Sequence, residues 1–260
     1  MSTAVIVMGA AGRMGSTLTR LVAEQNDMNL AGAVERKEAI GALGGLNCPV
    51  RADVGALLAD TPGAVIVDFT SPEASLATAR AAREVGAAHV IGTTGFSAAQ
   101  KEELETLAAG TPVFWSPNMS VGVNVLLKVL PMLTRLLGES YDLEMVELHH
   151  NKKKDAPSGT ALRLAECLAE ARNWRLEDTA RCCREGLIGA RPEKEIGIQT
   201  VRGGDVVGVH TAYFMGPGER IEVTHQAHSR ENFAGGALRA ARWLAGQKPG
   251  KLYNMQDMLI

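Results

Sequence analysis

The residues best suited to chemistry lie in one short segment, HHNKKKDAPSGTA, at positions 149–161. Two adjacent histidines, His149 and His150, precede three consecutive lysines and an aspartate. Imidazole groups donate, accept or relay protons near neutral pH, and lysine adds full positive charge. The segment therefore predicts a site for an anion to which a proton must be delivered. The alternative is a solvated basic turn at the end of a strand.

The second half of this segment predicts the start of a helix. Proline is favoured at the first helical position and serine at the cap, so the helix begins at Pro157 or Ser158. The N–H groups of Gly159 and Thr160 then lie at a positive helix end, where a carboxylate binds readily. With Lys153 nearby, we predict a pocket for a small polyanion.

A metal site is not predicted. No acid or cysteine spacing typical of zinc accompanies the histidines His149, His150, His210, His225 and His228. No C-x-x-C pair occurs among the cysteines Cys48, Cys167, Cys182 and Cys183. We interpret them as reduced, structural thiols of a cytoplasmic protein, with redox activity of the adjacent pair as the alternative.

A second candidate site is the glycine-rich stretch GAAGRMG, residues 9–15, between a predicted strand and a predicted helix. Glycines allow a tight turn and close approach of a pyrophosphate, to which the helix start offers N–H groups. The spacing is G-x-x-G-x-x-G instead of the usual G-x-G-x-x-G. A purely structural turn is therefore the alternative to a dinucleotide site.

The charges after the second predicted strand bear on the choice of cofactor. Glu35 lies about 20 residues after the glycines, where an acid accepts hydrogen bonds from a ribose diol and suits NAD. Arg36 and Lys37 follow at once, and a guanidinium there suits the 2′-phosphate of NADP. We predict that both cofactors are used; solvated loop charges are the alternative.

Two further loops follow predicted strands. They are GTTGF at 92–96 and SPNM at 116–119. Ligands of open α/β sheets bind at the carboxyl ends of strands, so small and hydroxyl side chains there can line a nicotinamide–ribose pocket. Ordinary turn chemistry explains both loops equally well.

The elements that must position these groups alternate in type over the first 120 residues. Short apolar stretches predict strands at 3–9, 28–35, 64–70, 89–94 and 112–116, and helical spacing appears at 13–25, 72–86 and 97–110. This β-α-β alternation indicates an α/β fold with a doubly wound parallel sheet of the Rossmann type. We expect this dinucleotide-binding domain to span residues 1–120.

The pattern changes after residue 120. The sequence predicts a long helix at 120–138 bent at Pro131, a strand at 141–150, a helix at 161–173, two strands joined as a hairpin at Gly203-Gly204 within 196–216, and a strand at 220–229. We expect a smaller α+β domain with a mixed sheet over residues 121–230. A last helix within 231–260 joins the first domain.

Composition narrows the functional class. The chain has 260 residues and a net charge of −2, which gives no sign of nucleic acid or an anionic membrane surface. Its apolar runs fall short of a membrane span, and its first residues read as a strand instead of a signal peptide. The small charged substrate must therefore be recognised locally.

Read with its flanks, the opening segment is ELHHNKKKDAPSGTA, residues 147–161. Together with GAAGRMG, VIGTTGF, SPNMSVGVN and VGVHTAYF, it closely resembles the 4-hydroxy-tetrahydrodipicolinate (dihydrodipicolinate) reductase family of lysine and diaminopimelate biosynthesis. The resemblance covers nearly the whole chain. It implies reduction of a cyclic dicarboxylate to tetrahydrodipicolinate with loss of water, using NADH or NADPH.

The resemblance also implies residue roles. His149 matches a proton donor or acceptor, Lys153 a proton donor, and His150, Gly159 and Thr160 substrate-binding positions. The cofactor segments match Gly9, Ala10, Ala11, Gly12, Arg13, Met14, Glu35, Arg36, Gly92, Thr93, Thr94, Ser116, Pro117, Asn118 and Met119. Members of the family are usually homotetramers built through the sheet of the second domain.

Two departures and two rival functions remain. Lysines flank Lys153 on both sides, so charge alone does not select it, and Met119 stands where phenylalanine is common in the family.

One rival function is that of another two-domain dehydrogenase, and the dehydrogenases that act through a thioester need a cysteine in a strand-end loop. The other is a cofactor-binding sensor, which leaves the His-Lys segment unexplained.

Overall fold

The computed structural model describes residues 2–259, which form two compact units. Unit 1 consists of the residues up to Val121 together with those from Glu231 onward, and unit 2 consists of Gly122–Arg230. Among residues 2–259, none of the helices has both the length and the apolar character needed to cross a membrane.

Unit 1 contains a seven-stranded sheet in the order β12-β6-β5-β4-β1-β2-β3, and all its neighbours are parallel. The strands are β1 (Thr3–Met8), β2 (Met28–Val34), β3 (Val50–Arg51), β4 (Val65–Asp68), β5 (His89–Ile91), β6 (Val113–Trp115) and β12 (Leu252–Tyr253). The prediction of a doubly wound parallel sheet is confirmed. The order reverses between β1 and β4, which is where ligands bind in such sheets.

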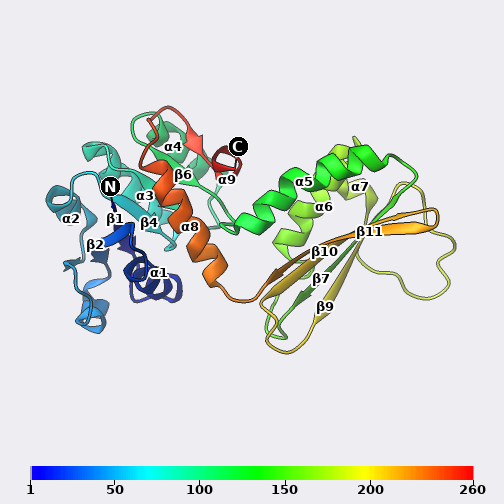
Figure 1. The fold of residues 1–260 in the computed structure, drawn as a ribbon, viewed down its shortest axis with the longest axis horizontal. Helices are drawn as coiled ribbons and strands as arrows, with labels where there is room; N and C mark the ends of the chain where they lie inside the picture. The colour runs from blue at the N-terminus through cyan, green and yellow to red at the C-terminus, as the bar shows by residue number, and fades with distance from the viewer. Residues whose placement is uncertain (1, 260) are drawn as a thin grey trace. The chain divides into compact units, whose positions relative to one another are not determined.

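The helices of unit 1 begin and end at residues that local chemistry favours. Ser71 caps one helix immediately before Pro72, and the helix ends at the left-handed Gly86. Ser97 and Gln100 form a capping box at the start of another. The helices, seen in Figure 1, are α1 (Arg13–Ala23), α2 (Val54–Asp60), α3 (Pro72–Val85), α4 (Ala98–Ala108), α8 (Glu231–Leu244) and α9 (Met255–Met258), with a 3-10 turn η1 (Lys37–Leu43).

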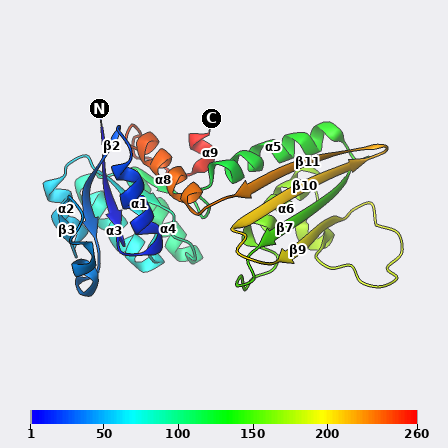
Figure 2. The same ribbon diagram turned by 60° about the horizontal axis from the view of Figure 1, so that its bottom comes forward.

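Helix α8 packs into the apolar core of unit 1. Leu238 and Leu244 are buried in one cluster with Val5 and Val67 of the central strands and with Phe114. Figure 2 shows α8 and α1 near the same part of the sheet. The chain therefore completes the core of unit 1 only after it has built unit 2.

Unit 2 contains a mixed five-stranded sheet in the order β11-β10-β7-β9-β8. Its strands are β7 (Asp142–His149), β8 (Ala180–Arg181), β9 (Ile196–Arg202), β10 (Gly208–Gly216) and β11 (Glu219–Ala227). The predicted hairpin at Gly203-Gly204 is wrong, because β7 lies between β9 and β10 and pairs with both. The hairpin of this sheet is instead β10–β11, through the turn at Gly218.

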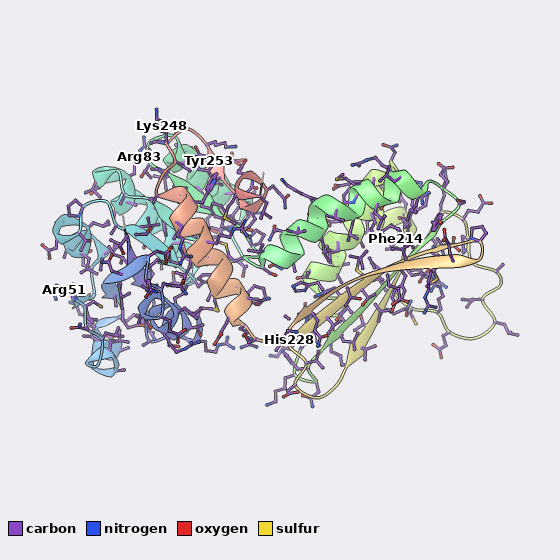
Figure 3. The ribbon with its side chains drawn as sticks, in the orientation of Figure 1. Arg51, Arg83, Phe214, His228, Lys248 and Tyr253 are labelled. Atoms are coloured by element: carbon purple, nitrogen blue, oxygen red, sulfur yellow. The ribbon has the colours of Figure 1, made fainter. Side chains whose placement is uncertain are left out.

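One face of this sheet carries the core of unit 2. Leu143 and Met145 of β7 and Phe214 of β10 are buried there against α5 (Val121–Leu137) and α6 (Gly159–Ala171). Figure 3 marks Phe214 beside these helices. Pro131 lies inside α5, which continues past it. A short helix, α7 (Leu176–Thr179), follows α6.

Candidate functional site

The polar end of β7 forms the centre of the site in unit 2. Glu147 and His149 follow Leu143 and Met145 on the same face of the strand, since side chains alternate along a strand. Glu147 is fully buried and His149 is nearly so. The alternation that fills the apolar core thus also places a carboxylate and an imidazole at its edge.

Glu147 accepts hydrogen bonds from four residues. Arg202 donates to its two oxygens over 2.7 and 2.8 Å, His149 Nδ1 lies at 2.6 Å, and the N–H of Ser158 and the hydroxyl of Thr200 complete the set at 2.9 and 3.2 Å. Burial alone would raise the pKa of Glu147, but the bonds from Arg202 and His149 lower it to about 2. The group is therefore a carboxylate at neutral pH.

This carboxylate fixes the proton on His149. An ionised carboxylate only accepts, so His149 donates through Nδ1 and keeps a lone pair on Nε2. Burial lowers the pKa of His149, and the charges of Lys153 and Arg202 lower it further, against the opposing effect of Glu147. His149 is accordingly a neutral imidazole that accepts hydrogen bonds at Nε2.

The position of His149 depends on a glycine in the neighbouring strand. A Cβ on Gly208 would lie 3.0 Å from His149 Nε2. We therefore expect Gly208→Ala to displace the imidazole by a few tenths of an ångström and to lower kcat by roughly tenfold, measured by steady-state kinetics. Gly203→Ala is the control, because a Cβ there meets nothing within 4 Å; equal losses in both variants would contradict this role for Gly208.

Hydrogen bonds of Ser158 and His210 fix the start of α6. Ser158 caps the helix by accepting from the N–H of Ala161 at 3.1 Å, and its hydroxyl lies 3.0 Å from His210 Nε2. Burial lowers the pKa of His210 to about 4, so His210 is neutral and accepts a hydrogen bond from the Ser158 hydroxyl. The cap and the imidazole beneath it fix the direction of the helix start.

This helix start is open to a ligand. A Cβ added to Gly159 meets nothing within 4 Å, so the space above it is clear. Gly159 and Thr160 are the first residues of α6 and lie at the positive end of its dipole. The predicted carboxylate site is therefore sterically and electrostatically suitable.

The three lysines differ in how far their side chains are exposed to solvent. Lys152 and Lys154 are exposed, whereas the Lys153 side chain is 20% exposed and its ammonium contacts Asp155 Oδ1 at 2.9 Å. That contact lowers the pKa of Asp155. His150 lies just past β7, and its buried Nδ1 has no hydrogen-bond partner within residues 2–259. Lys153 is thus the lysine turned towards the protein.

The glycine-rich loop of unit 1 fits a dinucleotide by its shape. A Cβ on Gly15 would lie 2.0 Å from the carbonyl oxygen of Gly9, so the helix must approach the loop without a side chain. Gly9 has a left-handed φ of +63°. Helix α1 begins at N-cap Gly12 with no side-chain cap, and no acid lies in its first turn. Its first N–H groups therefore suit a pyrophosphate.

Glu35 lies against this loop. Its carboxylate accepts from the N–H of Ala11 at 3.0 Å and from the N–H of Arg36 at 2.8 Å, and each oxygen keeps a lone pair for a ribose hydroxyl. The Arg36 side chain is 86% exposed, with its Nε 3.8 Å from Glu35. An acid for the diol and a guanidinium for a 2′-phosphate thus stand side by side.

The other two segments are held by internal hydrogen bonds. Thr93 accepts from Ser75 at 2.9 Å through its hydroxyl and from the indole of Trp115 at 3.0 Å through its carbonyl. Ser116 donates to the carbonyl of Asn118 at 2.8 Å. The Met119 side chain is buried in the apolar core of unit 1, so it supports this segment from beneath. Gly92, Thr94 and Pro117 complete the two segments.

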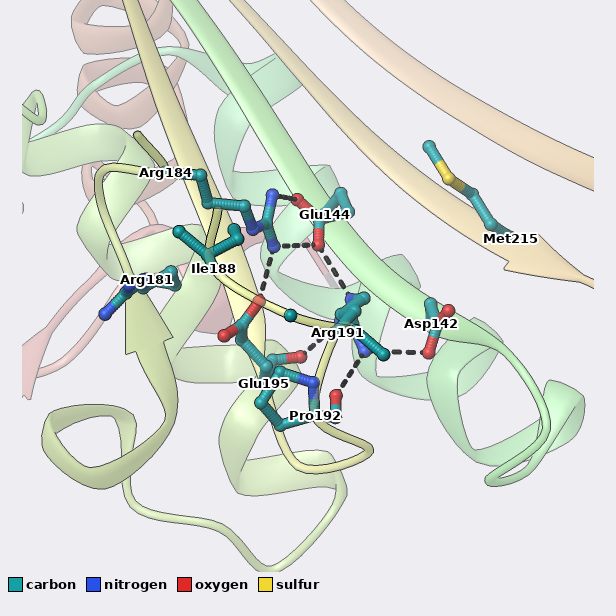
Figure 4. A pocket seen from close by; sticks show the side chains of 11 residues that line it. Asp142, Glu144, Arg181, Arg184, Ile188, Arg191, Pro192, Glu195 and Met215 are labelled. Atoms are coloured by element: carbon teal, nitrogen blue, oxygen red, sulfur yellow. Dashed lines mark hydrogen bonds and ion pairs between the residues drawn. The ribbon is translucent and has the colours of Figure 1, made fainter. Parts of the chain in front are cut away.

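A pocket of about 580 Å³ lies in unit 2 away from these residues, lined by Arg and acidic side chains of β7 and of the loop before β9 (Figure 4). Arg184 bridges Glu144 and Glu195 over 2.6 and 2.5 Å, and Arg191 bridges Glu144 and Asp142 over 3.0 and 2.7 Å. The charges of these arginines and acids compensate one another, so we interpret the group as a structural ion-pair network. Residues 2–259 hold no cluster of metal-ligating side chains.

Three contributors to the site had no role assigned from the sequence. Glu147 belongs to the quoted motif, but its five hydrogen bonds were not predicted. Arg202 precedes the glycines that were interpreted as a hairpin, and His210 was considered only as a metal ligand. An ionisable residue at an inward-facing position of a strand is the signal that marks Glu147 and His210.

Comparisons with known proteins identify the family of this chain. The sequence models described as "Dihydrodipicolinate reductase, N-terminus" and "Dihydrodipicolinate reductase, C-terminus" match residues 3–119 and 122–259. The 4-hydroxy-tetrahydrodipicolinate reductase of Nitratidesulfovibrio vulgaris strain Miyazaki F is 66% identical over 259 residues, covering 100% of both chains. That of Desulfovibrio desulfuricans is 63% identical over 258 residues, covering 99% of this chain and 100% of its own.

A solved structure is also similar. The dipicolinate-bound dihydrodipicolinate reductase from Paenisporosarcina sp. TG-14 superimposes with a TM-score of 0.78 at 25% identity, covering 98% of each chain. The match extends over both units. This chain therefore belongs to the dihydrodipicolinate reductase family.

Proposed function

We propose that this protein reduces 4-hydroxy-tetrahydrodipicolinate to tetrahydrodipicolinate in the biosynthesis of diaminopimelate and lysine. One hydride and one proton enter the substrate and one water leaves. The observation that carries the proposal is the site of unit 2, where an open helix start, a half-buried lysine and a neutral imidazole on a buried carboxylate lie together. Full-length likeness to reductases of that name supports the substrate.

The helix start binds the substrate carboxylates. The N–H groups of Gly159 and Thr160 receive one carboxylate, and His150, whose Nδ1 is buried without a partner, offers a further polar contact. Ser158, held by Glu147 and His210, keeps the helix start in place. The ring is thereby oriented before any bond changes.

Lys153 supplies the proton. When bound at the glycine-rich loop of unit 1, a nicotinamide dinucleotide would supply the hydride, and the residues of unit 2 would then meet the negative charge on the substrate ring. The ammonium of Lys153 carries a transferable proton and is directed by Asp155 at 2.9 Å. His149 accepts at Nε2, so it receives a hydrogen bond from substrate or water while Glu147 stabilises its orientation.

We further propose that both NADH and NADPH serve. Glu35 and Arg36 supply the two kinds of contact that distinguish the cofactors. We expect Arg36→Ala to raise the Kd of NADPH by about tenfold and to change that of NADH little, since one charge-assisted contact to the 2′-phosphate is lost. Isothermal titration with each cofactor measures this, and equal losses for the two would exclude a contact to the phosphate.

The decisive assay follows the absorbance of NADH or NADPH with freshly prepared 4-hydroxy-tetrahydrodipicolinate. We expect turnover that requires both reactants, with pyridine-2,6-dicarboxylate competing against the substrate. Binding of the cofactor with no turnover would favour the sensor. Turnover only with other oxidisable or reducible substrates would favour a different dehydrogenase.

We also propose a cytoplasmic homotetramer. Val201 and Met215 are exposed on the face of the unit 2 sheet opposite to its core, and an open apolar sheet face is suited to contact between subunits. Light scattering after size-exclusion chromatography gives the number of chains. A monomer at micromolar concentration would exclude this assembly.

A further inference from the structure

A buried acid and imidazole in unit 1 take no part in the chemistry proposed above. Asp68 ends β4 and His89 begins the adjacent strand β5, and neither side chain is exposed to solvent. His89 Nε2 lies 3.4 Å from Asp68 Oδ2. Within residues 2–259, Oδ2 of Asp68 and both nitrogens of His89 are buried without a hydrogen-bond partner, so the contact between the two side chains is the polar contact that Oδ2 has.

The other oxygen of Asp68 holds a turn. Oδ1 accepts from the N–H of Thr70 at 2.8 Å and from the Thr70 hydroxyl at 2.6 Å. Both bonds go to an ionised acceptor and are therefore strong. His89 lowers the pKa of Asp68 against the effect of its burial, which keeps the carboxylate ionised. The pair thus fixes the conformation of residues 68–70.

This turn touches both predicted cofactor segments. A Cβ on Gly9 would lie 3.0 Å from Thr70 Cγ2, so the Thr70 methyl packs against the first glycine of the loop. On the other side, the Asp68 carbonyl accepts from the N–H of Gly92 at 2.8 Å, and a Cβ on Gly92 would lie 2.2 Å from the Phe69 ring. The turn stands where the strand order reverses between β1 and β4.

We propose that Asp68 and His89 are positioning residues of the cofactor site. They hold residues 68–70 so that Thr70 and Phe69 set the spacing between the glycine-rich loop and the segment at 92–94. Neither of these buried side chains contacts the dinucleotide itself. This inference rests on the proposed function, because it assigns the two segments to one nicotinamide dinucleotide.

The test measures the binding of NADH to the full-length protein without substrate, by isothermal titration, beside thermal unfolding. His89→Leu removes the partner of Asp68 at similar volume. We expect the Kd of NADH to rise about tenfold, which corresponds to about 1.4 kcal/mol of binding free energy. Thr111→Val is the control, since it removes another fully buried hydrogen bond of unit 1, to the Ala87 carbonyl, far from the turn in sequence.

A second variant covers the case in which His89→Leu does not fold. Thr70 is exposed, and Thr70→Val keeps its methyl group while removing the hydroxyl that binds Asp68. Weaker NADH binding is expected here too, and the double variant should lose little more than the stronger single one, because both act through Asp68.

The outcomes are distinct. If the Tm falls in His89→Leu as in Thr111→Val while the Kd of NADH stays at the wild-type value in His89→Leu and Thr70→Val, the pair is merely structural and the inference is overturned. If the wild-type protein binds neither NADH nor NADPH, the proposed function fails, and this inference fails with it.

Discussion

Lys153→Ala is expected to lower kcat by about 10²–10⁴-fold, the range for removal of a general acid. Asp155 contacts the ammonium group of Lys153. Of the three lysines, Lys153 is the one whose side chain is turned towards the protein. Affinity for NADH should stay near the wild-type value, because the proposed cofactor site lies in unit 1. Single-turnover kinetics under saturating substrate measures the loss in the chemical step.

Matched controls lie on either side in the sequence. Lys152→Ala and Lys154→Ala each remove one positive charge from an exposed position of the same loop. Both should retain nearly full kcat if the position of the ammonium matters more than the charge of the loop. A loss of NADH affinity in Lys153→Ala, or an equal fall in kcat in all three variants, would contradict the role of proton donor.

Glu147→Gln should lower kcat by about 10²-fold or more, because an amide no longer fixes the proton on His149 Nδ1. The substitution keeps the volume of the side chain but removes the charge that pairs with Arg202 and His149. Steady-state kinetics gives the loss. Glu144→Gln is the control, since Glu144 is also an ion-paired acid of β7 but lies in the structural network with Arg184.

The same substitution should change how the free energy of unfolding depends on pH. The pKa of Glu147 is lowered in the folded protein from 4.5 to about 2. Its contribution to the free energy of unfolding is therefore fully present above about pH 4.5 and is lost as the pH falls towards 2. A shift of this size corresponds to roughly 3 kcal/mol of unfolding free energy. Urea unfolding between pH 7 and pH 2 should show this loss in the wild type and a flatter dependence in Glu147→Gln. Parallel curves would contradict the assignment.

Local patterns in the sequence were enough to predict much of the fold. Alternation of apolar strands with helices gave the parallel sheet, and Pro157-Ser158 marked the start of α6 within two residues of its observed position at Gly159. Each of these features depends on neighbours in the sequence. Glycines in the first loop were informative for the same reason, since their spacing reflects contacts between Gly9 and Gly15.

Features that depend on distant partners were not predicted. Two glycines after a strand indicate a turn, but they do not tell whether the flanking strands pair with each other, and β7 separates β9 from β10. Arg202 binds Glu147 across 55 positions and His210 contacts Ser158 across 52. Charge alone does not distinguish the three lysines; the family resemblance selects Lys153, and the contact with Asp155 supplies a physical reason for that choice.

The position of β7 between β9 and β10 affects how fast the backbone around the site exchanges hydrogen with solvent. Because β7 is paired on both sides, we expect its backbone amides to exchange slowly with solvent hydrogen. His149, at the end of β7, is therefore carried by one of the three interior strands of the unit 2 sheet. Lys153 lies beyond the strand, in the connection from β7 to α6, so we expect the backbone that carries the proton donor to exchange faster than the backbone that carries the acceptor.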